Sequence, residues 1–139
     1  GMLSHPAVAF AGAIGQPDSF AGELPCVYVE LVGGASVTVD ELVSHARDHI
    51  HERAAIPKHI EILPELPKTA VGKIFKPDLR KLAITRVYDA ALEGTGTRVL
   101  DVREDKKRGL VARLSREGAV DEAQVQARLG QFTTPWDWA

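Results

Sequence analysis

The stretch Leu66-Pro67-Lys68-Thr69-Ala70-Val71-Gly72-Lys73-Ile74 is the part of the sequence around which the other predicted elements are arranged. Pro67 stiffens the approach to this loop, because its ring fixes φ. Gly72 can adopt a backbone conformation that other residues avoid. We therefore predict a polar loop, supported by Pro67, Thr69 and Gly72, that presents Lys73 on a tight turn.

Lys73 is the candidate catalytic residue of this loop. Phosphoryl or adenylyl transfer needs a compact positive charge on a flexible side chain, since negative charge accumulates on several oxygens at once. Spacing alone also fits a plain surface turn closed by Gly72-Lys73. The pattern is not a P-loop, because Pro67 stands where the first glycine would be and Ile74 follows the lysine.

The residues before the loop predict a small mixed α and β arrangement. Alternating apolar residues predict a strand from Val8 to Ile14, and turn residues follow at Gly15–Asp18 and Gly22–Pro25. A continuous apolar run predicts a central strand over Cys26–Val32. Thr38 and Glu41 fit a capping box at the start of a helix. A short strand follows at His59–Leu63.

The residues after the loop predict one more helix, followed by a linker and a second group of strands and a helix. Pro77 suits the first turn of a helix, whose predicted buried face consists of Leu79, Leu82, Ala83, Val87, Ala90 and Ala91. Residues 93–97 read as a linker. Beyond it we predict strands at 99–102 and 110–114, a helix over 119–131 with Val120, Ala123, Ala127 and Leu129 or Phe132 inside, and a last strand near 133–138. The predicted fold class is α+β, a short mixed sheet flanked by helices with a C-terminal β-β-α-β extension.

Length and composition set the broad class of the protein. The 139 residues amount to one domain, or one small domain with an appendage. The net charge of −2 argues against nonspecific nucleic-acid binding. The sequence has no apolar run long enough to predict a membrane helix, and no leader that predicts a secretory signal. Gly1 before Met2 is interpreted as an expression remnant. The single cysteine, Cys26, indicates a reducing, cytoplasmic compartment and a buried small side chain.

Other chemical side chains have weaker patterns. His45 and His49 lie one helical turn apart, a spacing that zinc could use, but a third ligand is missing and a solvated helix face is favoured. We predict no metal site. Residues 106–108 form a basic turn for which solvent exposure is the default. Trp136 and Trp138 share one face of the last strand and are expected to cover an apolar surface of this chain or of a partner.

Taken together, these motifs give the chain a family resemblance. It resembles the small C-terminal domain of the AMP-forming acyl-CoA synthetases, the adenylate-forming group that also includes luciferases and nonribosomal adenylation domains. The resemblance covers residues 3–92 and lies in the order and spacing of six stretches: His5-Pro6-Ala7-Val8, Ile14–Asp18, Gly22-Glu23, Thr38–Leu42, Ile56–Ile60 and Leu66–Ile74. It implies two parts, a lid domain over residues 1–92 and an extension of unknown role over residues 93–139.

The resemblance implies a role for Lys73 in an ATP-dependent, AMP-forming carboxylic acid–CoA ligase. In the first half-reaction a carboxylate attacks the α-phosphate of ATP, and the matching lysine would bridge the carboxylate and the AMP oxygens. The lid would then rotate and admit CoA for thioester formation. Acetylation of Lys73 would silence it, because acetylation removes the charge.

The resemblance also says what the chain needs from elsewhere. A large N-terminal domain would hold the nucleotide, the acid and the Mg²⁺ that accompanies ATP, so we expect this chain to be a fragment that is inactive alone. Residues 53–57 lack the aromatic residue and the lysine often found before this Ile-Pro, and no CoA contact is assigned. Fatty acid metabolism is the expected setting, and the extension at 93–139 is a possible homo-oligomer contact.

Two alternatives stay open at this point. The chain could be a free-standing binding or regulatory module with the lid fold. It could also be the lid of an adenylate-forming enzyme that transfers its acyl group to a carrier protein instead of CoA.

Overall fold

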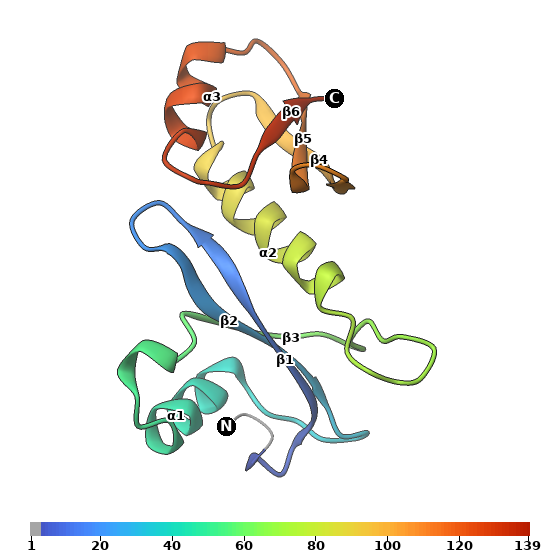
Figure 1. The fold of residues 1–139 in the computed structure, drawn as a ribbon. Coiled ribbons are helices and arrows are strands. Elements are labelled where there is room, and N and C mark those ends of the chain that lie inside the picture. Colours follow the sequence, from blue (N-terminus) through green and yellow to red (C-terminus); the bar gives the residue numbers. More distant parts are fainter. Residues whose placement is uncertain (1–3) are drawn as a thin grey trace. The chain divides into compact units, whose positions relative to one another are not determined.

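The computed structural model describes residues 4–139 and divides them into two compact units, which are described separately (Figure 1). The first unit takes the described residues up to Gly15 together with Leu24–Leu79. The second takes Gln16–Glu23 and Arg80–Ala139. The predicted expression remnant at Gly1 lies outside the described residues.

The first sheet has the strand order β1-β2-β3, formed by β1 (Val8–Asp18), β2 (Gly22–Leu31) and β3 (His59–Ile62). β2 and β3 run parallel, with Cys26 opposite His59 and Val29 opposite Ile62. The apolar run that includes Cys26 is therefore the central strand, as predicted, and Cys26 is fully buried. A strand buried on both faces reads as a continuous apolar run, which explains why the pattern was clear.

The turn between β1 and β2 lies later and is shorter than predicted. Residues 15–18 continue β1 and residues 22–25 begin β2, so the prediction of a loop over both stretches is wrong. Pro17 is tolerated because β1 is an edge strand, where a missing N–H leaves no neighbour unpaired. Asp18 makes the turn, since its Oδ2 accepts hydrogen bonds from the backbone N–H groups of Phe20 at 3.0 Å and Ala21 at 2.8 Å.

Helix α1 (Val39–His49) begins where predicted, and a 3₁₀ turn, η2 (Arg53–Ala55), follows it. Thr38 caps α1, because its Oγ1 accepts a hydrogen bond from the N–H of Glu41 at 3.1 Å. The apolar face of α1 packs against the sheet in one core, whose buried members are Val8, Val27, Val29, Leu42, Ala46 and Ile60.

Helix α2 (Lys76–Ala91) has the predicted extent but only part of the predicted buried face. Leu79 and Ala83 are buried as predicted, whereas Leu82 is 44% exposed, and Ala90 is exposed too. Ile84 and Tyr88 are buried instead, one helical turn apart, and they belong to the core of the second unit. The buried face of α2 therefore depends on packing against the later strands, and the sequence of the helix alone does not contain this information.

The second unit contains the predicted β-β-α-β extension. Its elements are β4 (Thr97–Asp105), β5 (Gly109–Arg116), α3 (Glu122–Leu129) and β6 (Trp136–Trp138), with the sheet order β4-β5-β6. β4 and β5 are antiparallel, and β5 and β6 are parallel. Within residues 4–139, two three-stranded sheets and three α-helices confirm the α+β class. The division of the chain at residue 92 stays a prediction.

Helix α3 buries only part of the predicted face. It begins only after Asp121, whose Oδ1 accepts a hydrogen bond from the N–H of Ala123 at 3.0 Å. Leu129 is buried as predicted, whereas Ala123 and Ala127 are exposed and Val125 is buried instead. Val120 precedes the cap and is half-buried.

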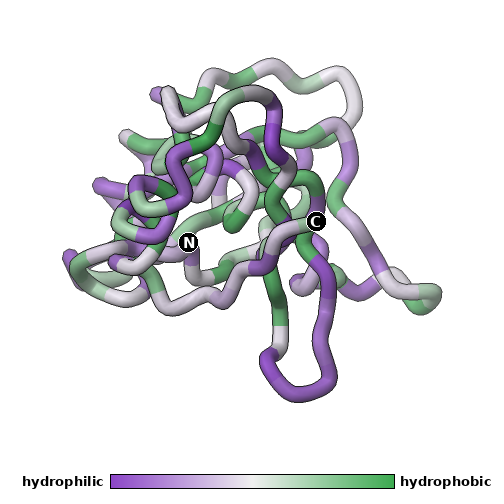
Figure 2. Tube along the Cα trace, turned by 90° about the horizontal axis from the view of Figure 1, so that it is seen from above, coloured by the Kyte–Doolittle hydropathy of each residue, from purple (hydrophilic) through white to green (hydrophobic). Residues whose placement is uncertain are grey.

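Aromatic side chains and a polar turn complete the second unit. Trp136 and Trp138 pack against its core, and their ring centroids are 5.5 Å apart. The turn between β4 and β5 carries a long hydrophilic stretch, drawn purple in Figure 2. No helix among residues 4–139 is long and apolar enough to cross a membrane.

Candidate functional site

The predicted loop around Lys73 is a small closed hairpin. The N–H of Thr69 donates to the carbonyl of Lys73 at 2.7 Å, and the N–H of Phe75 donates to the carbonyl of Pro67 at 2.8 Å. Lys68 and Ile74 face each other as an antiparallel bridge. The backbone of this loop is therefore held by its own hydrogen bonds, as in a β-hairpin with a short connection.

Gly72 and Thr69 shape the tip of the hairpin. Gly72 has φ +84°, a left-handed conformation that favours glycine, and a Cβ there would meet nothing within 4 Å. Glycine is therefore favoured at position 72 because of the backbone conformation, and not because a side chain would clash with a neighbour. The Oγ1 of Thr69 accepts a hydrogen bond from the N–H of Lys73 at 3.2 Å, and the N–H of Gly72 donates to the carbonyl of Thr69 at 2.9 Å.

The side chain of Lys73 is exposed, and within residues 4–139 it makes no hydrogen bond or ion pair. Its neighbour Val71 is 89% exposed at the same tip. A rigid backbone thus carries a cation whose charge is not neutralised by the described part of the chain. Such a cation can meet an anionic ligand without first breaking an internal ion pair.

The base of the hairpin is anchored by a contact that the sequence analysis missed. The Nζ of Lys68 donates to the Oε1 of Glu30 at 2.7 Å, and the N–H of Leu66 donates to the same oxygen at 2.8 Å. Both charged side chains are largely buried, with exposed fractions of 19% for Lys68 and 18% for Glu30. Glu30 is the one charged residue in the apolar run over residues 26–32, and a charge inside such a run was the sequence feature that could have indicated this contact.

The second strand of the hairpin packs against β1. A Cβ on Gly12 would lie 3.1 Å from the Cγ2 of Ile74 and 2.5 Å from the Cδ1 of Leu79. Ile74 follows Lys73 directly in the chain. Gly12 therefore allows the hairpin and the start of α2 to approach the sheet closely.

Glu30 should titrate below the usual range of a glutamate. The hydrogen bond from Lys68 lowers the pKa of Glu30 most, and the bond from the Leu66 N–H lowers it further. Because the folded pKa lies below the unfolded value of about 4.3, this contact stabilises the fold above that pH, and the contribution is lost as pH falls through the folded pKa. A ¹³C carboxyl titration should show this low midpoint, and Lys68→Met should raise it. An unchanged midpoint in Lys68→Met would contradict the assignment.

A separate pocket of about 280 Å³ lies between the end of α1, η2 and the start of β3. Three basic residues line it: Arg47, Arg53 and Lys58. Its remaining lining residues are apolar, namely Val43, Ile56, Pro57 and Ile60. Within residues 4–139 the three cations make no ion pair, so the pocket combines positive charge that is not paired with apolar lining residues. This combination suits an anion attached to a flat or apolar group.

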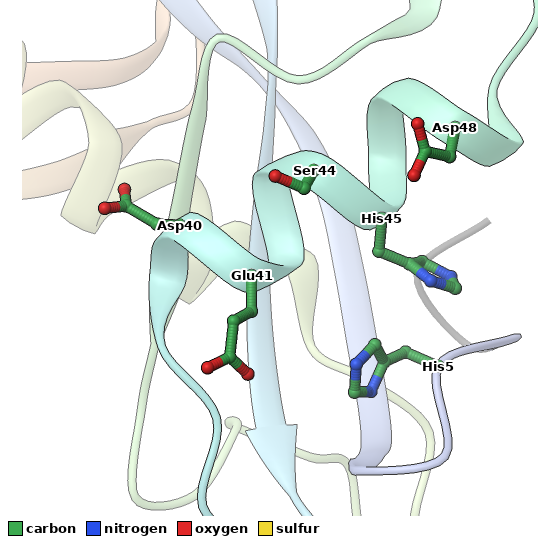
Figure 3. A pocket seen from close by; sticks show the side chains of 6 residues that line it. All are labelled: His5, Asp40, Glu41, Ser44, His45 and Asp48. Carbon is green, nitrogen blue, oxygen red and sulfur yellow. The ribbon is translucent and has the colours of Figure 1, made fainter.

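A shallow pocket on α1 is lined by two histidines, His5 and His45 (Figure 3). The rings of His45 and His49 stack at 3.9 Å, and His5 approaches His45 edge-on at 5.0 Å. Ser4 Oγ lies 2.8 Å from His45 Nε2, and His49 Nδ1 lies 2.8 Å from the carbonyl of His45. Among residues 4–139, no three His, Cys, Asp or Glu side chains are arranged to hold a metal ion. His45 and His49 are therefore stacked on the surface of α1, and His49 is hydrogen-bonded to the backbone of His45.

The basic turn at residues 106–108 is only partly free. The guanidinium of Arg108 bonds the carboxylate of Asp137 twice, at 3.0 and 2.7 Å. These bonds hold the pKa of Asp137 below its usual range. Arg108 thus ties the turn to β6 and leaves Lys106 and Lys107 as the solvated members.

Comparison with known proteins gives a consistent group of relatives. Residues 2–73 match the model of the AMP-binding enzyme C-terminal domain. The marinolic acid–CoA ligase of a Pseudoalteromonas species is 36% identical over 143 residues, which cover 97% of this chain and 22% of that protein. The acetyl-coenzyme A synthetase of Streptomyces avermitilis is 35% identical over 108 residues, which cover 76% of this chain and 17% of that protein.

A solved structure shares the fold of more than half of the chain. The o-succinylbenzoate CoA synthetase of Bacillus subtilis, in complex with its acyl-adenylate intermediate, superposes with a TM-score of 0.51 at 33% identity. The match covers 57% of this chain and 16% of that protein. The chain thus spans about a fifth of the length of the relatives that it matches.

Proposed function

The chain belongs to the family of AMP-binding enzyme C-terminal domains, and we propose on this premise that it is the lid of an ATP-dependent carboxylic acid–CoA ligase. In the proposed first half-reaction, a carboxylate oxygen of the acid attacks the α-phosphorus of ATP. The bond to pyrophosphate breaks, and an acyl-adenylate remains. The ammonium of Lys73 neutralises the charge that grows on the carboxylate and phosphate oxygens.

One observation carries this proposal: the ammonium of Lys73 is exposed and unpaired within residues 4–139, while its backbone is held in a closed hairpin. Pro67, Thr69 and Gly72 supply that hairpin. Preorganised charge of this kind costs no reorganisation when the transition state forms. The proposal is tested by replacing Lys73 and measuring the two half-reactions separately.

In the second proposed half-reaction, the thiol of CoA attacks the acyl carbon, the thioester forms and AMP leaves. The named relatives are CoA ligases, which favours CoA over a carrier protein as the acceptor and favours an enzyme domain over a free-standing module. We propose a large N-terminal domain as the partner that holds ATP, the acid and Mg²⁺. The described residues offer no set of three metal ligands, so no step is assigned to a metal here.

We further propose that the pocket of Arg47, Arg53 and Lys58 receives the phosphates of CoA. CoA carries a 3′-phosphate and a pyrophosphate beside an adenine ring, which matches a pocket lined by three cations and four apolar residues. At about 280 Å³ the pocket suits this end of CoA and is too small for the whole molecule.

A binding measurement on this chain checks the pocket. We expect CoA to bind more tightly than dephospho-CoA, and Arg47→Ala/Arg53→Ala to weaken CoA binding by about five- to tenfold, since two exposed ion pairs are lost. Lys106→Ala/Lys107→Ala removes the same charge elsewhere and is the matched control. Equal effects of the two double variants, measured by NMR titration, would rule out a specific pocket.

The proposals for the substrate, the cellular compartment and the oligomeric state are less detailed than those for the two half-reactions. The substrate is a carboxylic acid, and fatty acid metabolism is one setting for it. A cytoplasmic location rests on the single, buried Cys26. Homo-oligomerisation through residues 93–139 stays a prediction: the two tryptophans expected to cover an apolar surface pack against the core of their own unit.

A further inference from the structure

We propose that Glu30 is a positioning residue for adenylate formation, holding the base of the hairpin that carries Lys73. The proposal rests on the proposed function, because it assigns Glu30 a part in the same half-reaction. Glu30 lies on β2, outside the hairpin, and reaches no part of the tip by any described hydrogen bond. Its effect on the reaction would therefore pass through the residues that it holds.

A single oxygen of Glu30 fixes both the backbone and the side chain at the start of the hairpin. Its Oε1 accepts from the Leu66 N–H at 2.8 Å and from the Lys68 Nζ at 2.7 Å. The same ammonium donates to the Leu66 carbonyl at 3.3 Å. Leu66 itself is fully buried, so the carboxylate closes a compact group of contacts between β2 and the chain entering the hairpin.

Lys68 is also held from the side of β1. Its Nζ lies 4.5 Å from the centroid of the Phe10 ring, within the range of a cation–π contact. The long stem and charged head of Lys68 therefore have partners on two neighbouring strands. A lysine with several fixed partners loses the mobility that an exposed lysine keeps.

The anchored base is connected directly to the position of Lys73. Lys68 bridges Ile74, the residue after Lys73, and the Thr69 N–H donates to the carbonyl of Lys73 itself. A shift of the Lys68 strand would therefore move the paired strand and the backbone of Lys73 with it. Misplacement of a reacting group by about 1 Å can cost on the order of 100-fold in rate.

The experiment uses this chain joined in frame to a large adenylation domain, with Glu30→Leu, Glu30→Gln, Lys68→Met and Lys73→Ala compared. We expect Glu30→Leu to lower kcat for acyl-adenylate formation by about 10- to 100-fold, while thioester formation from premade acyl-adenylate stays within about twofold. Glu30→Gln keeps an acceptor oxygen and should recover most of the rate. Glu61→Leu is the matched control, since it removes a strand carboxylate that pairs with His59 and not with the hairpin.

Hydrogen exchange on the same variants gives a readout independent of activity. The Leu66 and Thr69 amides should exchange at least about tenfold faster in Glu30→Leu, with the β4–β5 amides unchanged. If Glu30→Leu does not fold, Lys68→Met tests the same contact from the other side. Loss of adenylation in Lys73→Ala but not in Glu30→Leu or Lys68→Met would overturn the positioning role alone, as would an equal fall in both half-reactions. Full adenylation activity in Lys73→Ala would overturn the proposed function instead.

Discussion

Replacing Lys73 with alanine should reduce acyl-adenylate formation by about 100- to 1000-fold in the chain joined to its adenylation domain. This is the loss observed when one preorganised group is removed from a developing negative charge, about 3–4 kcal/mol. Thioester formation from premade acyl-adenylate should persist, since no phosphate charge grows in that step. Pyrophosphate exchange measures the first half-reaction, and the loss of free CoA thiol from solution measures the second.

Lys76→Ala is the control for Lys73→Ala, because Lys76 is an exposed lysine at the start of α2, just outside the hairpin. It should leave both half-reactions within about twofold of the unmodified enzyme, as expected for a surface charge away from the reacting atoms. Equal losses in the two half-reactions of Lys73→Ala would contradict an adenylation role. They would indicate a general defect of folding or docking.

The local features of the candidate site could be predicted from the sequence. Gly72 supplies a left-handed turn and Thr38 caps α1, and each depends on residues within four positions along the chain. Turn and cap geometry of this kind is encoded by neighbouring residues. For the same reason the position of Lys73 on a tight turn was predictable before its surroundings were known.

The long-range parts of the site could not be predicted in the same way. Glu30 and Lys68 meet only because β2 lies beside the chain that enters the hairpin. The basic pocket similarly draws Arg47 from the end of α1, Arg53 from η2 and Lys58 from the residue before β3. A single sequence shows the charges but not the fold that brings them together.

The buried faces of the helices also could not be predicted fully from the sequence. The pattern of α2 identified Leu79 but also favoured Leu82, which is exposed, over Tyr88, which is fully buried. Helical periodicity gives several apolar stripes when apolar residues are frequent. The choice among them depends on β4, β5 and α3, which pack against Ile84 and Tyr88.

Tyr88→Ala should therefore be strongly destabilising, with a loss of about 3–5 kcal/mol in the free energy of unfolding of the second unit. The ring is fully buried and lies 5.1 Å from that of Phe132, and its hydroxyl donates to the Thr134 carbonyl at 2.7 Å. Burial raises the pKa of Tyr88, so the hydroxyl stays protonated and remains a donor at neutral pH. Alanine would remove both the packing and this bond.

The two tryptophans make this loss directly measurable. Trp136 and Trp138 are the only tryptophans of the chain and both pack against the core that contains Tyr88, so their fluorescence in urea reports the unfolding of this unit. Tyr88→Phe keeps the ring and loses one hydrogen bond, and should cost only about 0.5–1.5 kcal/mol. If Tyr88→Ala cost no more than Tyr88→Phe, the ring would not be packed in this core, and the burial of α2 against the second sheet would be wrong.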